Sequence, residues 1–149
     1  ALRRAGIRKK TVLIGSGKIA TGGDLVQALA LGADMVNIAR GFLLSLGCIQ
    51  AMHCHTNRCP TGVATQNKYL QRGLDPTSKS VRVANYAKTL KKDMFMILHS
   101  VGLEHPSQLR RDHLTIVVAP GQTRSMRDLY PYPEDAEPVL HQNWNSRAA

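Results

Sequence analysis

A strand, a helix and a second strand follow one another in residues 11–41, TVLIGSGKIATGGDLVQALALGADMVNIARG. A short apolar run from Thr11 to Ile14 breaks at glycine, and a second run spans Met35 to Ile38. Between the two runs, leucine and alanine recur at helical spacing, from a cap at Thr21 or Asp24 to Gly32. Continuous apolar strands on either side of a helix are typical of a βαβ unit in a buried parallel sheet. The stretch therefore predicts an α/β fold.

Both predicted strands end in small residues, GSGK after the first and ARG after the second. A phosphate group needs backbone N–H groups that point toward it and no Cβ in the way. In (β/α)8 barrels, the loops after the last two strands commonly form such a site. Glycine after a strand is also an ordinary tight-turn residue, so spacing alone leaves both interpretations open. A dinucleotide-binding loop is disfavoured, because position 20 is Ala where the G-x-G-x-x-G pattern needs its last glycine. The candidate phosphate-binding residues are Ser16, Gly17, Lys18, Ala39, Arg40 and Gly41.

All three cysteines of the chain lie in one stretch, GCIQAMHCHTNRCPTGVATQ, at Cys48, Cys54 and Cys59. A three-iron cluster needs one thiolate per iron, and three cysteines satisfy that count. A zinc site would need a fourth ligand, which His53 or His55 could supply. On an extended loop, however, these histidines point away from the cysteine between them, which favours positions outside a ligand set. Spacing leaves an iron–sulfur cluster, a zinc site and unligated thiols open.

The second half of the chain predicts a long helix. Apolar residues from Val83 to Val101 form one helical stripe that Gly102 ends, and the turn-rich segment LDPTSKS precedes it. Pro106 marks the start of a short helix. From Ala119 onward Pro, Asn, Arg and Asp dominate, which predicts an extended or poorly ordered tail. We therefore divide the chain into residues 1–71 with the βαβ unit and the cysteine loop, a helical extension over 72–118, and a tail over 119–149.

Charge and hydropathy exclude several classes of protein. The net charge is +10, but the basic residues are scattered and aromatic residues are only 5% of the chain, which argues against a nucleic-acid interface. No apolar run approaches the roughly 18 residues of a membrane span. The N-terminal sequence ALRRAGIRKK has no apolar core of a secretory signal. Clustered thiols without an export signal predict a reducing compartment, and we expect a cytoplasmic protein.

Two of these stretches together resemble a known family. GSGKIATGGDLVQALALGADMVNIARGF followed by the cysteine stretch is similar to the C-terminal part of the FMN-binding barrel of glutamate synthase large subunits, over about residues 7–115. The resemblance implies the last two β/α units of a (β/α)8 TIM barrel, with an iron–sulfur loop and C-terminal helices. It implies that the six candidate phosphate-binding residues hold FMN, and that Cys48, Cys54 and Cys59 bind a [3Fe-4S] cluster.

The resemblance also implies an activity and partners. The family reaction is the reductive formation of L-glutamate from 2-oxoglutarate and glutamine-derived ammonia. Electrons arrive through the cluster from ferredoxin or from an NAD(P)H-oxidising small subunit. The implied partners are the rest of the barrel and a glutamine amidotransferase domain or subunit, so we expect a fragment that is inactive alone and folds poorly. The larger members carry an acidic residue and paired glycines where this chain has SGKI, and no residue is assigned as catalytic.

Three alternative functions stay open at this point. The chain is also consistent with a non-catalytic iron–sulfur electron-transfer subunit, in which flavin binding is lost. An N-methylglutamate synthase-type subunit would use the same scaffold. A zinc-stabilised interaction module would use the cysteine loop without redox chemistry.

Overall fold

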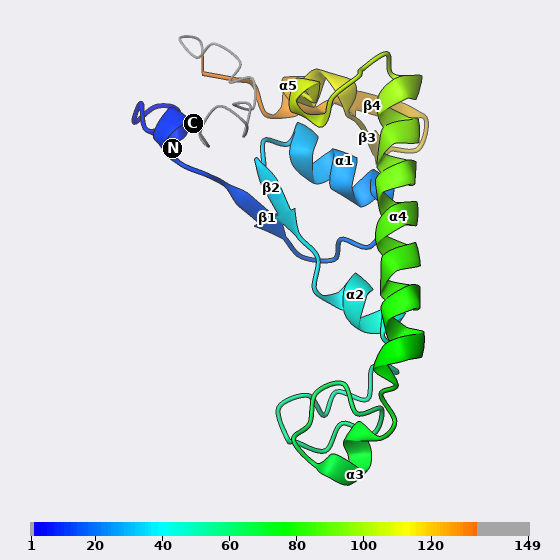
Figure 1. Cartoon of the computed structure of the whole chain (residues 1–149). Coiled ribbons are helices and arrows are strands. Elements are labelled where there is room, and N and C mark those ends of the chain that lie inside the picture. The colour runs from blue at the N-terminus through cyan, green and yellow to red at the C-terminus, as the bar shows by residue number, and fades with distance from the viewer. Residues whose placement is uncertain (1, 134–149) are drawn as a thin grey trace, which may run out of the picture.

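The computed structural model of the protein describes residues 2–133. Its longest element is helix α4 (Pro76–Ser100), along which the other elements are arranged. The βαβ unit packs along the middle and C-terminal part of α4 (Figure 1). The cysteine loop and the short helix α3 (Lys68–Gln71) lie at the N-terminal end of α4. A hairpin and the short helix α5 (Met126–Leu129) lie at the other end. The predicted α/β character is confirmed for this part of the chain.

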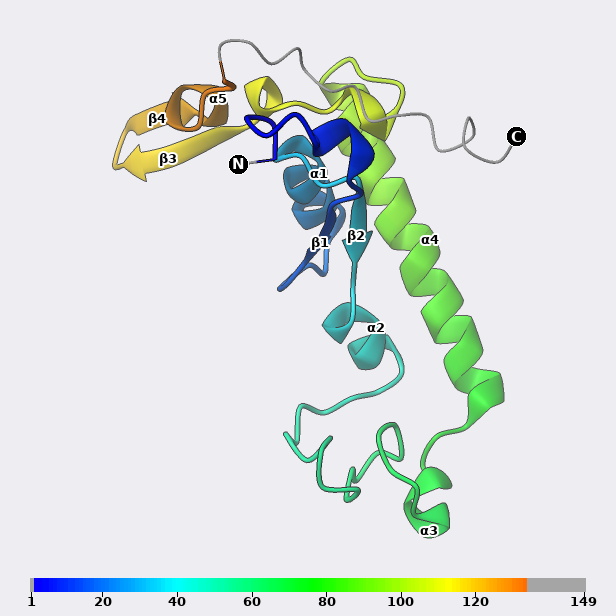
Figure 2. The same ribbon diagram turned by 90° about the vertical axis from the view of Figure 1, so that its left-hand side faces the viewer.

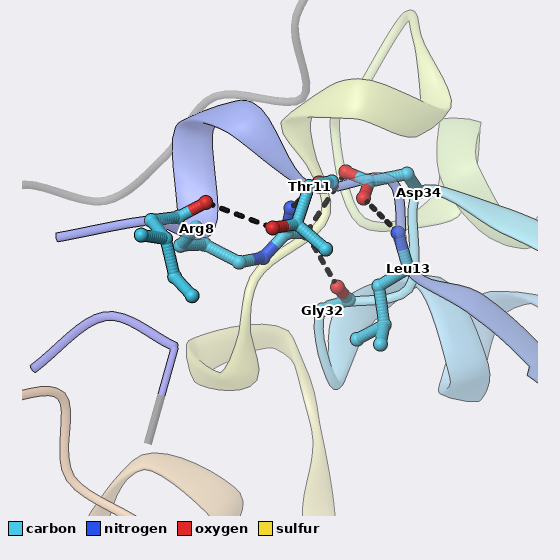
Figure 3. A network of polar contacts seen from close by, with 6 residues as sticks. Arg8, Thr11, Leu13, Gly32 and Asp34 are labelled. Atoms are coloured by element: carbon cyan, nitrogen blue, oxygen red, sulfur yellow. Dashed lines mark hydrogen bonds and ion pairs between the residues drawn. The ribbon is translucent and has the colours of Figure 1, made fainter. Parts of the chain in front are cut away.

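The βαβ unit consists of β1 (Ile14–Ser16), α1 (Gly22–Ala30) and β2 (Met35–Asn37), with the strands parallel and paired from Ile14↔Met35 to Ser16↔Asn37. The first strand begins later than the apolar run from Thr11 predicts. The backbone N–H of Leu13 donates to the Asp34 carboxylate at 2.7 Å rather than to a strand carbonyl. Arg8 donates to the same carboxylate at 2.9 Å (Figure 3). The Asp34 side chain therefore takes the hydrogen bond that a neighbouring strand would provide if the sheet continued toward Thr11.

The predicted capping of α1 is confirmed. The Thr21 hydroxyl accepts a hydrogen bond from the Asp24 N–H at 3.2 Å, while the Asp24 carboxylate accepts one from the Thr21 N–H at 2.9 Å. Such a capping box satisfies two N–H groups that a helix start leaves unpaired. At the other end Gly32 has φ +112°, a conformation that glycine adopts without the steric penalty of a Cβ.

The strands are not buried as the sequence predicts. Ile14 is 60% exposed and Met35 is 44% exposed, and the alternation along each strand places both on the face away from α1. Figure 2 views the molecule from the side of this sheet, with α1 behind it. Within residues 2–133 only one face of the sheet is covered, because a two-stranded sheet with one helix has nothing to pack on its other face.

The core lies where α1 meets the C-terminal half of α4. Val26, Ala30, Leu98 and Leu109 form its buried centre, and Leu98 is completely buried. The two helices touch closely at Gly22, where a Cβ would stand 2.6 Å from the backbone nitrogen of Met94.

Helix α4 starts earlier than its apolar stripe predicts, at Pro76 rather than near Val83. Asp75 caps it, accepting from the Thr77 N–H at 3.1 Å, so the segment expected as a turn-rich joint forms the first turns of the helix. These turns carry no apolar stripe because they extend past the core. The predicted C-terminal stop at Gly102, with φ +77°, is confirmed. Among the described helices, α4 included, none is long and apolar enough to cross a membrane.

The C-terminal part contains more regular structure than the sequence predicts. The expected short helix at Pro106 is a 3₁₀ turn, η2 (Pro106–Gln108), followed by η3 (Arg111–His113). Strands β3 (Thr115–Ala119) and β4 (Gln122–Ser125) form an antiparallel hairpin, and α5 follows. Regular structure thus continues past residue 119, because β3, which is rich in β-branched residues, pairs with β4 across a Pro–Gly turn. Residues 134–149 of the expected tail lie outside the described part.

The remaining elements are short. The 3₁₀ turn η1 (Arg8–Lys10) precedes the βαβ unit, and α2 (Arg40–Ser45) leads from β2 toward the cysteine loop.

Candidate cofactor site at the strand ends and the cysteine loop

The two strand exits lie side by side at one end of the sheet. Ser16, the last residue of β1, pairs with Asn37, the last residue of β2, and its hydroxyl donates to the Asn37 carbonyl at 3.3 Å. Residues 16–18 therefore leave the sheet beside the segment that leads to residues 39–41, the cap and first turn of α2. The structure brings the two predicted halves of the phosphate site to the same sheet edge, and each half carries one exposed cation, Lys18 or Arg40.

The first loop has an unusual backbone. Gly17 has φ +114° and Lys18 has φ +54°, so two consecutive residues occupy the left-handed side of conformational space. A lysine there is strained by about 1–2 kcal/mol relative to an ordinary conformation. Strain of this kind is a reason to suspect function, because successive turned peptides can direct their N–H groups toward an anion. The loop borders an open cavity of about 440 Å³ that Ser16, Gly17 and Lys18 help to line.

Asp24 limits how an anion can be held at the start of α1. Its carboxylate accepts hydrogen bonds from the N–H groups of Ala20 at 3.0 Å and Thr21 at 2.9 Å. These bonds, of which the one from Ala20 has the largest effect, hold the pKa of Asp24 below its usual value. Asp24 is therefore a carboxylate at neutral pH. Those two N–H groups are thus already used. A phosphate would take its contacts from residues 16–18 and from the second strand exit.

The segment after β2 packs against Tyr86, a residue that the sequence pattern marks only as part of an apolar helical stripe. Gly41 is buried, and a Cβ on it would overlap the hydroxyl oxygen of Tyr86. The Tyr86 ring meets Phe42 edge to face, with ring centroids 5.1 Å apart. Its hydroxyl donates to the Ala20 carbonyl at 2.8 Å, and burial raises its pKa. Tyr86 lies in the apolar stripe that predicts the long helix. In the sequence, only its hydroxyl group indicates a role other than packing.

The structure does not bring the three cysteines together. Cys59 is buried, Cys48 is half-buried and Cys54 is exposed. Within residues 2–133, no set of three Cys, His, Asp or Glu side chains is arranged to hold a metal ion. His53 and His55 are both exposed.

Cys59 nevertheless lies in surroundings that favour a thiolate. The Thr61 hydroxyl is 3.4 Å from its sulfur, and the backbone N–H groups of Ala64, Thr61 and Val63 also point at it. The Thr61 hydroxyl, followed by the Ala64 N–H, lowers the pKa of Cys59 to about 7. A thiolate is the form that ligates iron or zinc, and N–H groups around sulfur are a recognised way to tune such sites. The donor set therefore fits a thiolate-ligated metal group in kind and number.

The backbone of the cysteine loop is also constrained. Gln50, Met52 and Asn57 all have positive φ between +57° and +62°. Asn57 joins the middle of the loop to its C-terminal end, since its side-chain oxygen accepts from the Gln66 N–H at 2.5 Å and its carbonyl accepts from the Thr65 hydroxyl at 2.6 Å. Several non-glycine residues in this region of conformational space cost energy that the surrounding structure must offset.

Positive charge surrounds the loop. Residues 47–66 contain no Asp or Glu. From α4, the Lys79 ammonium lies 3.1 Å from the Cβ position of Gly47, and the Arg82 guanidinium lies 3.9 Å from it. Gly47 directly precedes Cys48, so two cations flank the first cysteine of the loop. This electrostatic setting suits an anionic group such as a thiolate-ligated cluster.

The described residues thus form an α/β chain with two adjacent strand ends and a loop that contains all three cysteines. Comparison with known sequences agrees, because the family model described as "Conserved region in glutamate synthase" matches residues 1–104. The chain belongs to the glutamate synthase-like family.

Individual relatives support this assignment. The chain is similar to the glutamate synthase large subunit-like protein YerD of Bacillus subtilis, with 42% identity over 113 residues, 76% of this chain and 22% of YerD. It is 37% identical over 115 residues to an archaeal glutamate synthase [NADPH] of Methanocaldococcus jannaschii, covering 76% of this chain and 22% of the relative. A ferredoxin-dependent glutamate synthase of Cyanidium caldarium is 38% identical over 103 residues, 69% of this chain and 6% of that protein. The chain thus spans less than a quarter of the length of these relatives.

Proposed function

We propose that this chain is the part of a glutamate synthase-type oxidoreductase that contains the last two β/α units of an FMN-binding TIM barrel and the loop for a [3Fe-4S] cluster. The observation that carries the proposal is the position of the two strand ends, which lie side by side, with the chain continuing from β2 through α2 into the three-cysteine loop. Membership of the glutamate synthase-like family supports it.

The FMN phosphate would be held by the backbone of residues 16–18 and 39–41. When bound, FMN supplies hydride transfer. The chain's own residues would position the phosphate and neutralise its negative charge. The turned backbone at Gly17 and Lys18 would supply peptide N–H groups to the anion, and Lys18 and Arg40 would add positive charge.

The cluster would be ligated by Cys48, Cys54 and Cys59, and when bound it supplies one-electron transfer. Cys59 is the pre-organised ligand, since its thiolate is already stabilised by Thr61 and by backbone N–H groups. Cys48 and Cys54 have to move toward it, which is common because metal binding and the folding of a site are coupled. Lys79 and Arg82 would balance the negative charge that the ligated thiolates bring.

The reaction we propose is the reductive formation of L-glutamate from 2-oxoglutarate and glutamine-derived ammonia. It requires the remaining barrel strands, an amidotransferase domain or subunit, and an electron donor, either ferredoxin or an NAD(P)H-oxidising subunit. The uncovered sheet face at Ile14 and Met35 supports the need for further strands, because apolar residues on a sheet are normally covered. We assign no catalytic residue within this chain.

The test is cofactor analysis of the intact protein, purified anaerobically. We expect FMN, together with iron and sulfide in the ratio of a [3Fe-4S] cluster. Replacing Cys59 with Ser should abolish the cluster. The matched controls His53→Ala and His55→Ala should retain it, because these side chains are exposed and outside the ligand set.

Three results would contradict the proposal. A colourless protein with stoichiometric zinc would indicate the zinc-stabilised interaction module. Iron without flavin would indicate an electron-transfer subunit. Loss of iron in the histidine variants would place histidine in the ligand set and exclude an all-cysteine cluster.

A further inference from the structure

Tyr86 is a side chain that touches both strand exits. It comes from α4, yet its hydroxyl donates to the carbonyl of Ala20, 66 residues earlier, in the segment that follows β1. The same hydroxyl lies against Gly41, and the ring packs on Phe42, both of which follow β2. One phenol therefore stands between the segment after the first strand and the segment after the second.

The contact with Gly41 is possible only because glycine has no Cβ. Any larger residue would overlap the hydroxyl oxygen and come within 3.0 Å of the ring carbon that bears it. The hydroxyl is thus held at a fixed depth between the two segments. Beyond the strand pair itself, where Ser16 bonds to Asn37, the Tyr86 phenol is thus a second link between the two segments.

We propose that Tyr86 is a positioning residue for a phosphate monoester, holding the segment after β1 and the first turn of α2 at the spacing at which residues 16–18 and 39–41 both contact one phosphate. This inference rests on the proposed function, in which that phosphate belongs to FMN. Tyr86 acts through Ala20 and Gly41, and it does not itself bind the ligand.

The proposal predicts a selective effect on the phosphate. FMN and riboflavin share the isoalloxazine ring and differ by the phosphate group. If Tyr86 only stabilised the fold, its loss would weaken both ligands alike. If Tyr86 sets the spacing of a phosphate site, its loss weakens FMN and leaves riboflavin unchanged.

The experiment compares Tyr86→Phe with the unmodified intact protein, measuring FMN and riboflavin dissociation constants by flavin fluorescence. Removing one hydrogen bond should weaken FMN by about two- to tenfold. The riboflavin constant and the unfolding midpoint should move little. Tyr69→Phe is the matched control, because Tyr69 is 76% exposed and belongs to α3, which lies with the cysteine loop at the N-terminal end of α4 (Figure 1).

A second variant tests the same contact by changing Gly41 instead of Tyr86. Gly41→Ala should weaken FMN selectively by pushing the hydroxyl away. In the double variant with Tyr86→Phe the overlapping atom is gone, so the combined loss should be smaller than the sum.

Either equal losses for FMN and riboflavin or an unchanged FMN constant in Tyr86→Phe would overturn the inference. Full additivity in the double variant would also overturn it. An unmodified protein that binds neither flavin would remove the proposed function and this inference with it. If the unmodified protein binds FMN but the variants do not behave as expected, only this inference fails and the proposed function stands.

Discussion

Lys18 occupies a backbone conformation, φ +54°, that favours glycine. Replacing it with Gly should relieve the Cβ strain, partly offset by the greater freedom of glycine in the unfolded chain. We expect Lys18→Gly to raise the free energy of unfolding by up to about 1 kcal/mol, measured by urea denaturation. The control Lys88→Gly, in the middle of α4, should lower it by about 1 kcal/mol. A loss of stability in Lys18→Gly would mean that the lysine side chain stabilises the loop.

The Thr61 hydroxyl is the first cause of the lowered pKa of Cys59, which is about 7. In apo protein lacking Cys48 and Cys54, Thr61→Val should raise this pKa toward the ordinary value of a thiol, about 8.5. Ultraviolet thiolate absorbance against pH measures it. Thr56→Val is the control, because the Thr56 hydroxyl donates to the His53 carbonyl and accepts from the Arg58 N–H, and neither bond involves a cysteine. Equal titration curves for both variants would contradict the assignment.

The same pKa has a consequence for stability. A thiol whose pKa is lowered on folding stabilises the folded state above the unfolded pKa, and this contribution is lost as the pH falls through the folded pKa. For apo Cys59 the loss should therefore occur between about pH 8.5 and pH 7, and the unfolding midpoint should fall across that window. Thr61→Val should flatten the dependence.

Asp34 accepts from both Arg8, at 2.9 Å, and the Leu13 N–H, at 2.7 Å (Figure 3), with side chains only 11% and 20% exposed for Arg8 and Asp34. Asp34→Asn should cost about 1–3 kcal/mol of unfolding free energy, because it weakens hydrogen bonds to a charged group. The exposed pair of Asp112 and Arg127 is the control, and Asp112→Asn should cost less than about 1 kcal/mol. Similar losses in both variants would contradict a special role for the Arg8–Asp34 pair.

At the scale of elements, the fit of α1 against α4 depends on Gly22. A Cβ there would stand 2.6 Å from the Met94 nitrogen, a backbone atom that cannot rotate away. We expect Gly22→Ala to lower the free energy of unfolding by about 1–3 kcal/mol through helix displacement. The neighbouring Gly23→Ala is the matched control, because the nearest atom is 3.7 Å from its Cβ position. It should be neutral or slightly stabilising, as alanine favours helix, and a comparable loss there would contradict a packing effect.

The cysteine loop shows how an element acquires a charge environment from another part of the chain. Its own residues 47–66 contain no acidic group, and α4 adds Lys79 and Arg82 beside Gly47. Helix α4 therefore contacts the loop, the second strand exit and the core in turn along one side, through Lys79, Tyr86 and Leu98.

At the scale of the whole molecule, residues 2–133 contain a small core and an uncovered sheet. The buried centre consists of Val26, Ala30, Leu98 and Leu109, while Ile14 is 60% exposed. A chain with so little buried apolar surface is marginally stable. We expect the isolated 149-residue chain to give a broad, weakly cooperative melt and no retained FMN. A sharp cooperative melt with bound flavin would show that these residues are sufficient by themselves.

Much of the local structure could be predicted because it depends on neighbours in sequence. Thr21 and Asp24 cap α1 through residues three positions apart, and Gly32 and Gly102 end helices because φ is positive there. The cysteine spacing and the βαβ pattern likewise sufficed to predict an α/β member of the family to which the comparisons assign the chain. The start of α4 was missed because the apolar stripe reports burial, and its first turns are not buried.

The sequence by itself determined the strand–helix–strand order of residues 11–41, the cap and stop of α1, and the positions of the three thiols, since these features depend on residues close together in the chain. Only the tertiary structure decided that Ile14 and Met35 are exposed, that Lys79 lies beside Gly47, and that Tyr86 bonds to Ala20 66 residues away. Those facts depend on how elements pack. Packing is set by the fit of many side chains at once, which no local spacing contains.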